Sequence, residues 1–264
     1  MNLLSDDKAE LLNYERPPVT EVVYGISFAP LNSLLVPHLG VLWEEFRSEY
    51  PKCEEKPPLI TPSEGFTLTD LPPLPRVWFV EEGGNQLIQI QRDRFLHNWR
   101  EISPRDNYPS YEQLKLRYQQ LFDKFIAFIV RYELGPIRPR SAEMSYINHI
   151  VIGECIKSLE DVGEIFPDFR WRVSEVPRDL EAVNWQTVLR LPDGSGVLST
   201  AIRSAYRASD SKPVFVFELT ARKTSGEFEM SKLWSWFDLA HIQIIKNFAC
   251  FTDEQVQTTV WGRK

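Results

Sequence analysis

The densest group of residues that could bind a ligand is the segment 91–100, QRDRFLHNWR. Its arginines carry planar guanidinium groups that grip carboxylate or phosphate, and its aromatic rings could stack on bases. This mixture predicts a site for a small anionic molecule, a nucleotide or a single nucleic-acid strand. The alternative is a solvated strand edge on which Asp93 pairs with a neighbouring arginine, and we favour this plainer interpretation. The candidate binding residues here are Arg92, Arg94, Phe95, Asn98, Trp99 and Arg100.

A second candidate region is the run 138–153, RPRSAEMSYINHIVIG, near the middle of the chain. Apolar residues alternate along it, which predicts a strand with one buried face. Asn148 interrupts that face, and Tyr146 precedes it on the same side. A buried carboxamide must find hydrogen-bond partners or cost about 1–3 kcal/mol. Asn148 therefore either ties a neighbouring backbone in place, which we favour, or meets a ligand beside Tyr146.

Acid–base or metal chemistry has few candidates among the four histidines. Asp238 and His241 are three residues apart in a predicted helix, so they could share a face and hold a metal or form an orienting pair. The alternatives are a surface pair or a core histidine satisfied by hydrogen bonds. Phosphate-binding glycine loops, zinc-protease motifs and nucleophile elbows are all missing from the sequence. We therefore predict no catalytic residue, no metal ligand and no cofactor. The sequence favours a protein that is not an enzyme.

Composition indicates a globular chain with a substantial core, since 43% of its 264 residues are hydrophobic and 33 are aromatic. The net charge of −7 argues against binding nucleic acid with the whole surface. Residues 76–140 are the basic part, with 11 basic and 8 acidic residues, a net charge of +3. The three cysteines are far apart and form no metal-binding pair. With no apolar span and no signal-like start, we expect a cytoplasmic protein without membrane association.

Periodicity predicts strands and helices in an order that occurs twice. In the first half a strand at 19–28 precedes a helix at 33–50, strands at 76–81, 86–92 and 95–99, and a long helix that begins after Ser110 and ends before Gly135. The segment 51–75 is rich in proline, so it is a connection or at most an edge strand. In the second half the strand at 138–153 precedes a helical piece at 158–165, strands at 169–176, 183–191, 196–204 and 213–221, and helices at 231–248 and after Thr252. Thr252 and Gln255 form a capping-box pattern, which predicts that Thr252 caps this last short helix.

This order predicts an α+β fold of two similar halves, each with the order strand, helix, strands, helix. Both halves contribute to a mostly antiparallel sheet covered by the two long helices. The predicted divisions are a polar lead-in at 1–16, a first half at 17–137 and a second half at 138–264, packed as one body. Glu21 and Tyr24 align with Glu143 and Tyr146 as E-x-x-Y. A duplication and a chance echo of strands and helices explain this pattern equally well.

Four short motifs, spread over nearly the whole chain, carry a family resemblance. They are Glu21-Val-Val23, Arg92-Asp-Arg-Phe95, Tyr146-Ile-Asn148 and Trp261-Gly262. In these motifs the chain resembles an uncharacterised prokaryotic family of similar length and sporadic distribution. That distribution implies an accessory role, such as a component of a bacterial defence or mobile-element system. His149 stands where the family more often has arginine.

Together these patterns predict a non-enzymatic binding protein with a protein partner or a second copy of itself. Trp234 and Trp236, on the last long helix, are candidate interface residues. Two alternatives stay open: a small-molecule or nucleotide-binding domain, and single-stranded nucleic-acid binding through Arg94, Phe95 and Trp99 together with Arg100.

Overall fold

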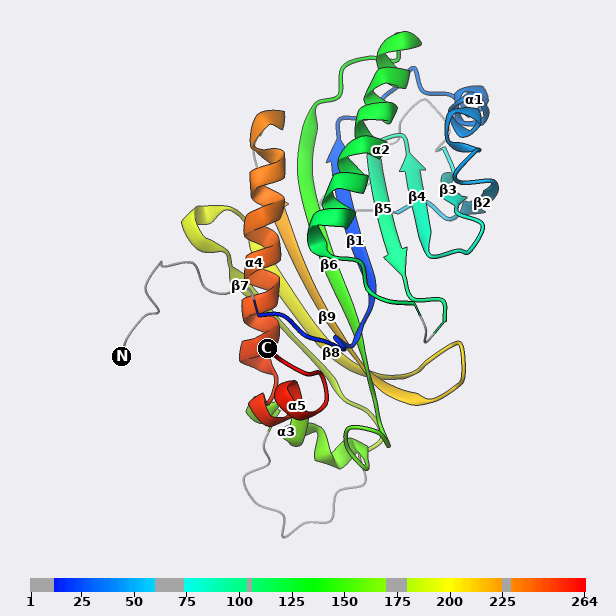
Figure 1. The fold of residues 1–264 in the computed structure, drawn as a ribbon. Coiled ribbons are helices and arrows are strands. Elements are labelled where there is room, and N and C mark those ends of the chain that lie inside the picture. Colours follow the sequence, from blue (N-terminus) through cyan, green and yellow to red (C-terminus); the bar gives the residue numbers. More distant parts are fainter. Residues whose placement is uncertain (1–11, 60–73, 104–105, 170–179, 225–228) are drawn as a thin grey trace. The chain divides into compact units, whose positions relative to one another are not determined.

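The computed structural model describes residues 12–59, 74–103, 106–169, 180–224 and 229–264 (Figure 1). It is a mixed protein, 33% helical and 35% strand, with a large antiparallel sheet. This confirms the predicted α+β class. No helix in the described ranges is long and apolar enough to cross a membrane.

The chain divides into two compact units. The N-unit comprises Glu21–Glu143 and Lys223–Leu233. The C-unit comprises Met1–Thr20, Met144–Arg222 and Trp234–Lys264. Three long strands contribute residues to both units: β1 (Val19–Phe28), β6 (Pro139–Val151) and β9 (Pro213–Thr224).

Five strands of the N-unit are hydrogen bonded in the order β2-β3-β4-β5-β1. β2 is Lys52–Lys56, β3 is Arg76–Val80, β4 is Gln86–Gln91 and β5 is Arg94–Arg100. All four pairings within this order are antiparallel. Gly84, in the turn between β3 and β4, has a φ of 82°, a left-handed conformation that glycine adopts without strain. This is the hairpin that the paired glycines predict.

Two helices pack on one face of this part of the sheet. α2 (Tyr111–Arg131) crosses β5 and β1 in Figure 1, and its Tyr118 ring lies 5.4 Å from Tyr24 of β1. α1 (Val36–Phe46) places Phe46 against Phe79 of β3. Ser110 and Gln113 form the predicted capping box at the start of α2.

The C-unit has the strand order β6-β9-β8-β7. β7 is Asn184–Arg190, β8 is Val197–Tyr206 and β9 is Pro213–Thr224. The long helix α4 (Leu233–Phe251) packs on this sheet, since Phe248 stacks on Phe217 of β9 at 5.8 Å. The short helices are α3 (Val162–Ile165) and α5 (Glu254–Thr259).

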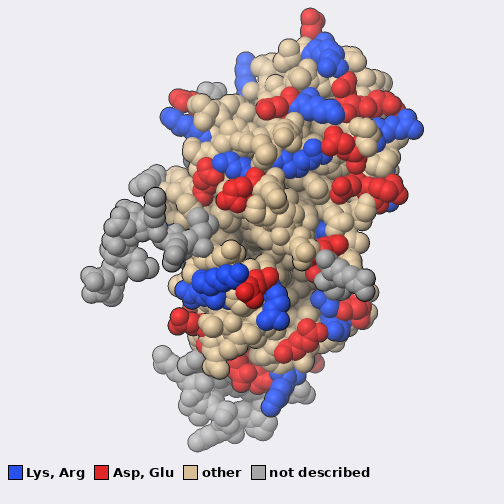
Figure 2. Space-filling view, in the orientation of Figure 1, with Lys and Arg blue, Asp and Glu red and all other residues tan. Residues whose placement is uncertain are grey.

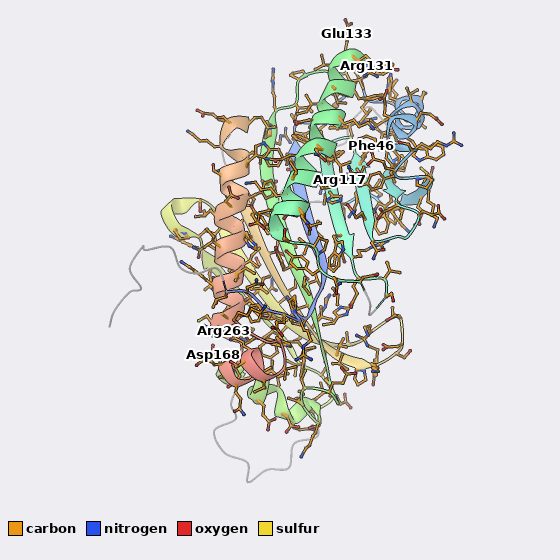
Figure 3. The ribbon with its side chains drawn as sticks, in the orientation of Figure 1. Phe46, Arg117, Arg131, Glu133, Asp168 and Arg263 are labelled. Carbon is orange, nitrogen blue, oxygen red and sulfur yellow. The ribbon has the colours of Figure 1, made fainter. Side chains whose placement is uncertain are left out.

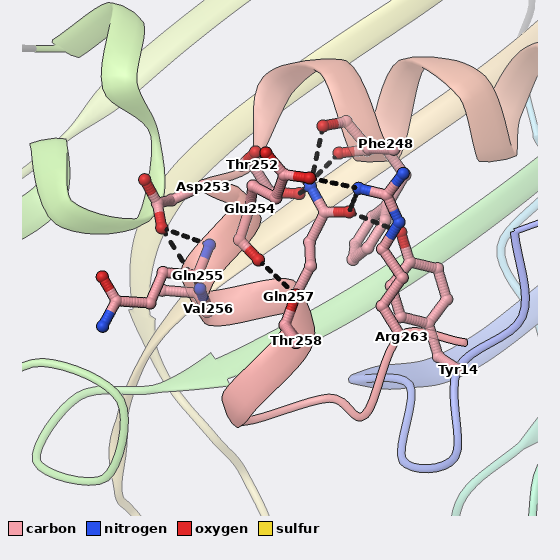
Figure 4. Close-up of polar contacts among 11 residues, drawn as sticks. Tyr14, Phe248, Thr252, Asp253, Glu254, Gln255, Val256, Gln257, Thr258 and Arg263 are labelled. Atoms are coloured by element: carbon pink, nitrogen blue, oxygen red, sulfur yellow. Dashed lines mark hydrogen bonds and ion pairs between the residues drawn. The ribbon is translucent and has the colours of Figure 1, made fainter.

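The C-terminus of the C-unit is fixed by one buried amide (Figure 4). Gln257, on α5, is 1% exposed. Its Nε2 donates to the carbonyl oxygens of Ala249 and Thr252, and its Oε1 accepts from the Tyr14 hydroxyl and the Arg263 guanidinium. The amide therefore joins the residues before β1 to the last helix and to the chain end.

Two local predictions are wrong or fall outside the structure. Thr252 does not cap α5, because Asp253 accepts the N–H groups of Gln255 and Val256 while the Thr252 hydroxyl donates to the Phe248 carbonyl. The strand predicted at 169–176 starts instead in a 3-10 turn, Pro167–Phe169. The rest of that strand, with Arg170, Trp171 and Arg172, lies outside the described residues.

Candidate functional site

The candidate residues on β5 are divided between the two faces of the sheet. Successive side chains of a strand point to opposite sides, so Phe95, His97 and Trp99 share one face and Asn98 belongs to the other. Phe95 lies under α2, where its ring centroid is 4.9 Å from that of Phe125. Phe95 and Trp99 are 0% and 4% exposed. Neither ring is available to stack on a base in this structure.

His97 lies between these two rings and is fully buried. Its ring stacks on Tyr118, and Nε2 is 3.2 Å from Gln86 Oε1, while Nδ1 has no hydrogen-bond partner. Burial, with a smaller contribution from the positive charge of Arg117, lowers the pKa of His97 to about 3. The ring is therefore neutral at physiological pH, with Nε2 donating to Gln86.

The opposite face of the N-unit sheet carries a chain of amides that the sequence predictions missed. Asn98 Nδ2 donates to Glu21 Oε1 of β1 at 2.6 Å, and Gln89 Nε2 of β4 donates to Asn98 Oδ1 at 2.7 Å. Gln89 Oε1 in turn accepts from Arg76 at 2.9 Å and from the Trp78 indole at 3.0 Å. Both amides are at most 5% exposed. Side chains from four neighbouring strands are thereby held in fixed positions.

Three positively charged side chains surround Trp78, where the row of hydrogen-bonded amides ends. Lys56 Nζ is 4.6 Å from the ring centroid, and the guanidinium carbons of Arg76 and Arg100 are 5.5 and 5.6 Å away. Such distances allow cation–π attraction. We call this surface the Trp78 face, defined by Lys56, Arg76, Trp78, Gln89, Asn98 and Arg100.

The charges of the Trp78 face are incompletely balanced. Lys56 pairs with Glu54 at 2.8 Å, but no carboxylate in the described ranges pairs with Arg76 or Arg100. The Nε atoms of both arginines are buried and lack a hydrogen-bond partner. Desolvation and the nearby positive charge of Arg94 lower the pKa of Arg76. Among the described residues, neither guanidinium group therefore has a carboxylate as its countercharge.

The face of the N-unit that carries α1 and α2 differs in its balance of charges. Figure 2 shows Lys and Arg interspersed with Asp and Glu over the region of α1 and α2. Arg117 and Arg131, labelled on α2 in Figure 3, pair with Glu49 and Glu45. The arginines on that side are balanced by neighbouring acids.

The remaining arginines of the predicted cluster, Arg94 and Arg92, differ in their contacts. Arg94 donates from Nε and from a terminal nitrogen to the two carboxylate oxygens of Asp93, as in the plainer interpretation of this segment. Arg92 lies in the turn between β4 and β5, where its carbonyl accepts the Leu31 N–H. Its buried Nε has no partner.

Tyr146 and Asn148 have partners within the C-unit. Asn148 is 3% exposed and donates to the Phe217 carbonyl of β9 at 3.0 Å, so it ties two strands together. The Tyr146 hydroxyl is 3.1 Å from His241 Nδ1, and both side chains are buried. This corresponds to the favoured strand tie for Asn148 and to the core-histidine alternative for His241.

The two tryptophans predicted at an interface also contact their own unit. Trp236 is 5% exposed, and its indole N–H donates to the Ser195 carbonyl at 2.9 Å. Trp234 is half-buried and stacks on Phe237. Trp236 is thus packed against the turn between β7 and β8.

Metal and cysteine chemistry have little support among the described residues. That part of the chain contains no group of three or more His, Cys, Asp or Glu side chains that could hold a metal ion. Cys53, Cys155 and Cys250 are free thiols.

Comparison with known proteins adds no identity: no protein-family model matches the sequence, and no curated protein does.

Proposed function

We propose that this chain is a binding protein whose Trp78 face holds an acidic segment of a partner protein. The observation that carries the proposal is the pair of guanidinium groups, Arg76 and Arg100, placed over Trp78 without a carboxylate among the described residues. Their buried Nε atoms have lost water and gained no acceptor. A carboxylate from a partner would supply the countercharge and would accept hydrogen bonds from the terminal N–H groups of the two guanidiniums.

The arrangement favours recognition of a particular geometry over diffuse charge attraction. Arg76 is held by Gln89, and Arg100 donates to the Gly84 carbonyl, so each guanidinium is oriented before a partner arrives. Oriented guanidinium groups lose less conformational entropy on binding, and their N–H groups suit the two oxygens of a carboxylate. Aspartate or glutamate side chains of an extended segment fit this chemistry.

Nucleic acid is the weaker candidate for this face. The net charge of −7 repels a polyanion, and the stacking rings of the predicted cluster, Phe95 and Trp99, are buried. A nucleotide or another small anion could bind the same guanidinium groups. The experiment below separates these ligands.

The test is fluorescence anisotropy of the full chain with three probes: a labelled polyglutamate peptide, a labelled single-stranded oligonucleotide and ATP as an unlabelled competitor. We expect the peptide to bind at low salt and the double variant Arg76→Ala/Arg100→Ala to weaken binding by about tenfold or more. Arg131→Ala is the matched control, because it removes an arginine that already has a partner on the other face.

Each outcome decides between the candidates. Tighter binding of the oligonucleotide, lost in the double variant, would replace the partner-protein proposal with the nucleic-acid alternative. Displacement of the peptide by ATP at lower concentration than by free glutamate would favour a nucleotide site. Equal loss in Arg131→Ala, or no binding of any probe, would remove the Trp78 face as a site.

We also propose that the two units are copies of one ancestral unit, and their topology supports this. In each unit the first strand neighbours the last one: β1 beside β5 and β6 beside β9. Tyr24 and Tyr146, the aligned tyrosines, each lie on the strand face that contacts a long helix, α2 and α4 respectively. An accessory role in a bacterial defence or mobile-element system, which the family resemblance implies, suits a binding protein of this kind.

A further inference from the structure

β7 differs from the other terminal strand in how its free edge is protected. β2 ends the strand order in the N-unit with the sequence KCEEK, in which four of five residues are charged. Such charges discourage another strand from pairing. β7 ends the order in the C-unit with NWQTVLR, which has one charge and leaves Val188 and Leu189 60% and 39% exposed. In the described ranges only β8 pairs with β7.

The hydrogen-bonding groups on this free edge can be assigned from the pairing with β8. The Val183 carbonyl accepts the Ser204 N–H, and the Leu191 N–H donates to the Gly196 carbonyl. Along a strand of an antiparallel pair, the backbone N–H and C=O groups of successive residues point alternately toward the neighbouring strand and away from it. The backbone groups of odd-numbered β7 residues therefore point toward β8, and those of even-numbered residues point outward. The backbone N–H and C=O groups of Asn184, Gln186, Val188 and Arg190 therefore point away from the sheet.

We infer that β7 pairs with β7 of a second copy of this chain, antiparallel, across a two-fold axis at Thr187. This register places Gln186 opposite Val188, Trp185 opposite Leu189 and Asn184 opposite Arg190 of the other copy. Every outward-facing residue then exchanges both backbone hydrogen bonds with an outward-facing residue. No like charges meet, and exposed Leu189 covers Trp185 on the same face.

A second copy satisfies this edge better than an unrelated peptide. The strand pairs with itself without placing like charges opposite each other, and its faces match across the axis, as an isologous two-fold contact requires. Pairing also protects the exposed β7 edges of both copies at once. The inference is independent of the Trp78 face, which belongs to the N-unit.

The test measures the mass of the full chain by analytical ultracentrifugation over a micromolar concentration series. Val188→Pro removes an outward N–H and leaves the β7–β8 hydrogen bonds intact. We therefore expect the dissociation constant of the dimer to rise at least about tenfold. Val188→Ala keeps the N–H and is the matched control. Circular dichroism of both variants checks that they fold.

A charge pair tests the register itself. Gln186→Glu with Val188→Glu sets like charges opposite each other across the two-fold axis, whereas Gln186→Lys with Val188→Glu sets opposite charges there. We expect the first pair to favour the monomer and the second to keep the dimer. A wild-type chain that stays monomeric throughout the series, or a dimer indifferent to Val188→Pro, would overturn the inference. Equal behaviour of the two charge variants would reject this register.

Discussion

Acidification should destabilise this protein through His97. The ring is buried among aromatic side chains, and its pKa falls from the usual 6.5 to about 3 in the folded chain. Between these two values the unfolded chain binds a proton that the folded chain does not. Stability is therefore fully present above pH 6.5 and falls by about 1.4 kcal/mol for each pH unit below it, until pH 3 is reached. At pH 5 the loss attributable to His97 is about 2 kcal/mol.

The variant His97→Phe isolates this contribution. Phenylalanine cannot be protonated and suits the stacking site beside Tyr118, although it gives up the contact with Gln86. Urea unfolding followed by tryptophan fluorescence should give the free energy of unfolding of both proteins at pH 8 and at pH 5. We expect the wild type to lose about 2 kcal/mol more than the variant over this interval.

The comparison at pH 8 is the internal control, because His97 is neutral there in both the folded and the unfolded chain. Other titrating groups act equally on the wild type and the variant, so they cancel in the difference. Equal losses in the two proteins, or an NMR titration of the His97 ring with a midpoint near 6.5, would refute the reasoning.

Two further predictions concern buried amides. Gln257→Ala removes an amide that donates to Ala249 and Thr252, and it should lower the free energy of unfolding by about 3 kcal/mol. Gln255, which lies nearby, is exposed, so Gln255→Ala should change the free energy of unfolding by less than about 0.5 kcal/mol. A similar small change in both would mean that the chain end is not held as described. Asn148→Ala should cost about 1–3 kcal/mol in thermal or chemical unfolding, since it leaves a buried carbonyl without its donor, and an unchanged midpoint would show that this carbonyl has another partner.

Local patterns in the sequence predicted most of the elements well. The alternation after Pro18 gave the strand at 19–28 with the bounds of β1, and the capping box at Ser110 and Gln113 gave the start of α2. These signals depend on residues close in sequence, whose interactions are set by the period of a strand or the first turn of a helix. The same local reasoning favoured a strand tie for Asn148, which the contact with Phe217 supplies.

The candidate site was harder to predict because it depends on strand register. The segment 91–100 placed Phe95 and Trp99 with the arginines, yet alternation along β5 turns both rings to the opposite, buried face, where Phe95 packs against Phe125 of α2. The amide chain joins Glu21 to Asn98, 77 residues apart, and no local pattern shows that β1 and β5 are neighbours. One signal was available: Arg76 and Trp78 alternate with the apolar residues of β3, which predicts that they share the polar face.

The motifs behind the family resemblance coincide with contacts that hold the fold. Trp261 packs on Phe248, and Gly262 has a φ of 65°, which favours glycine. Tyr146 and Asn148 are tied to α4 and β9. Arg76 and Trp78 lie outside these motifs. These motif residues therefore contribute to packing within each unit, and they gave no indication of Arg76 and Trp78.

The amide chain beneath the Trp78 face has a polarity that its two ends impose. Arg76 and the Trp78 indole can only donate hydrogen bonds, so Gln89 must turn its oxygen toward them. Glu21, as a carboxylate, can only accept, so Asn98 must turn its nitrogen toward it. All the dipoles between them then align head to tail. The aligned amides turn the oxygen of Gln89 toward Arg76, which steadies that guanidinium although no carboxylate in the described part of the chain contacts it.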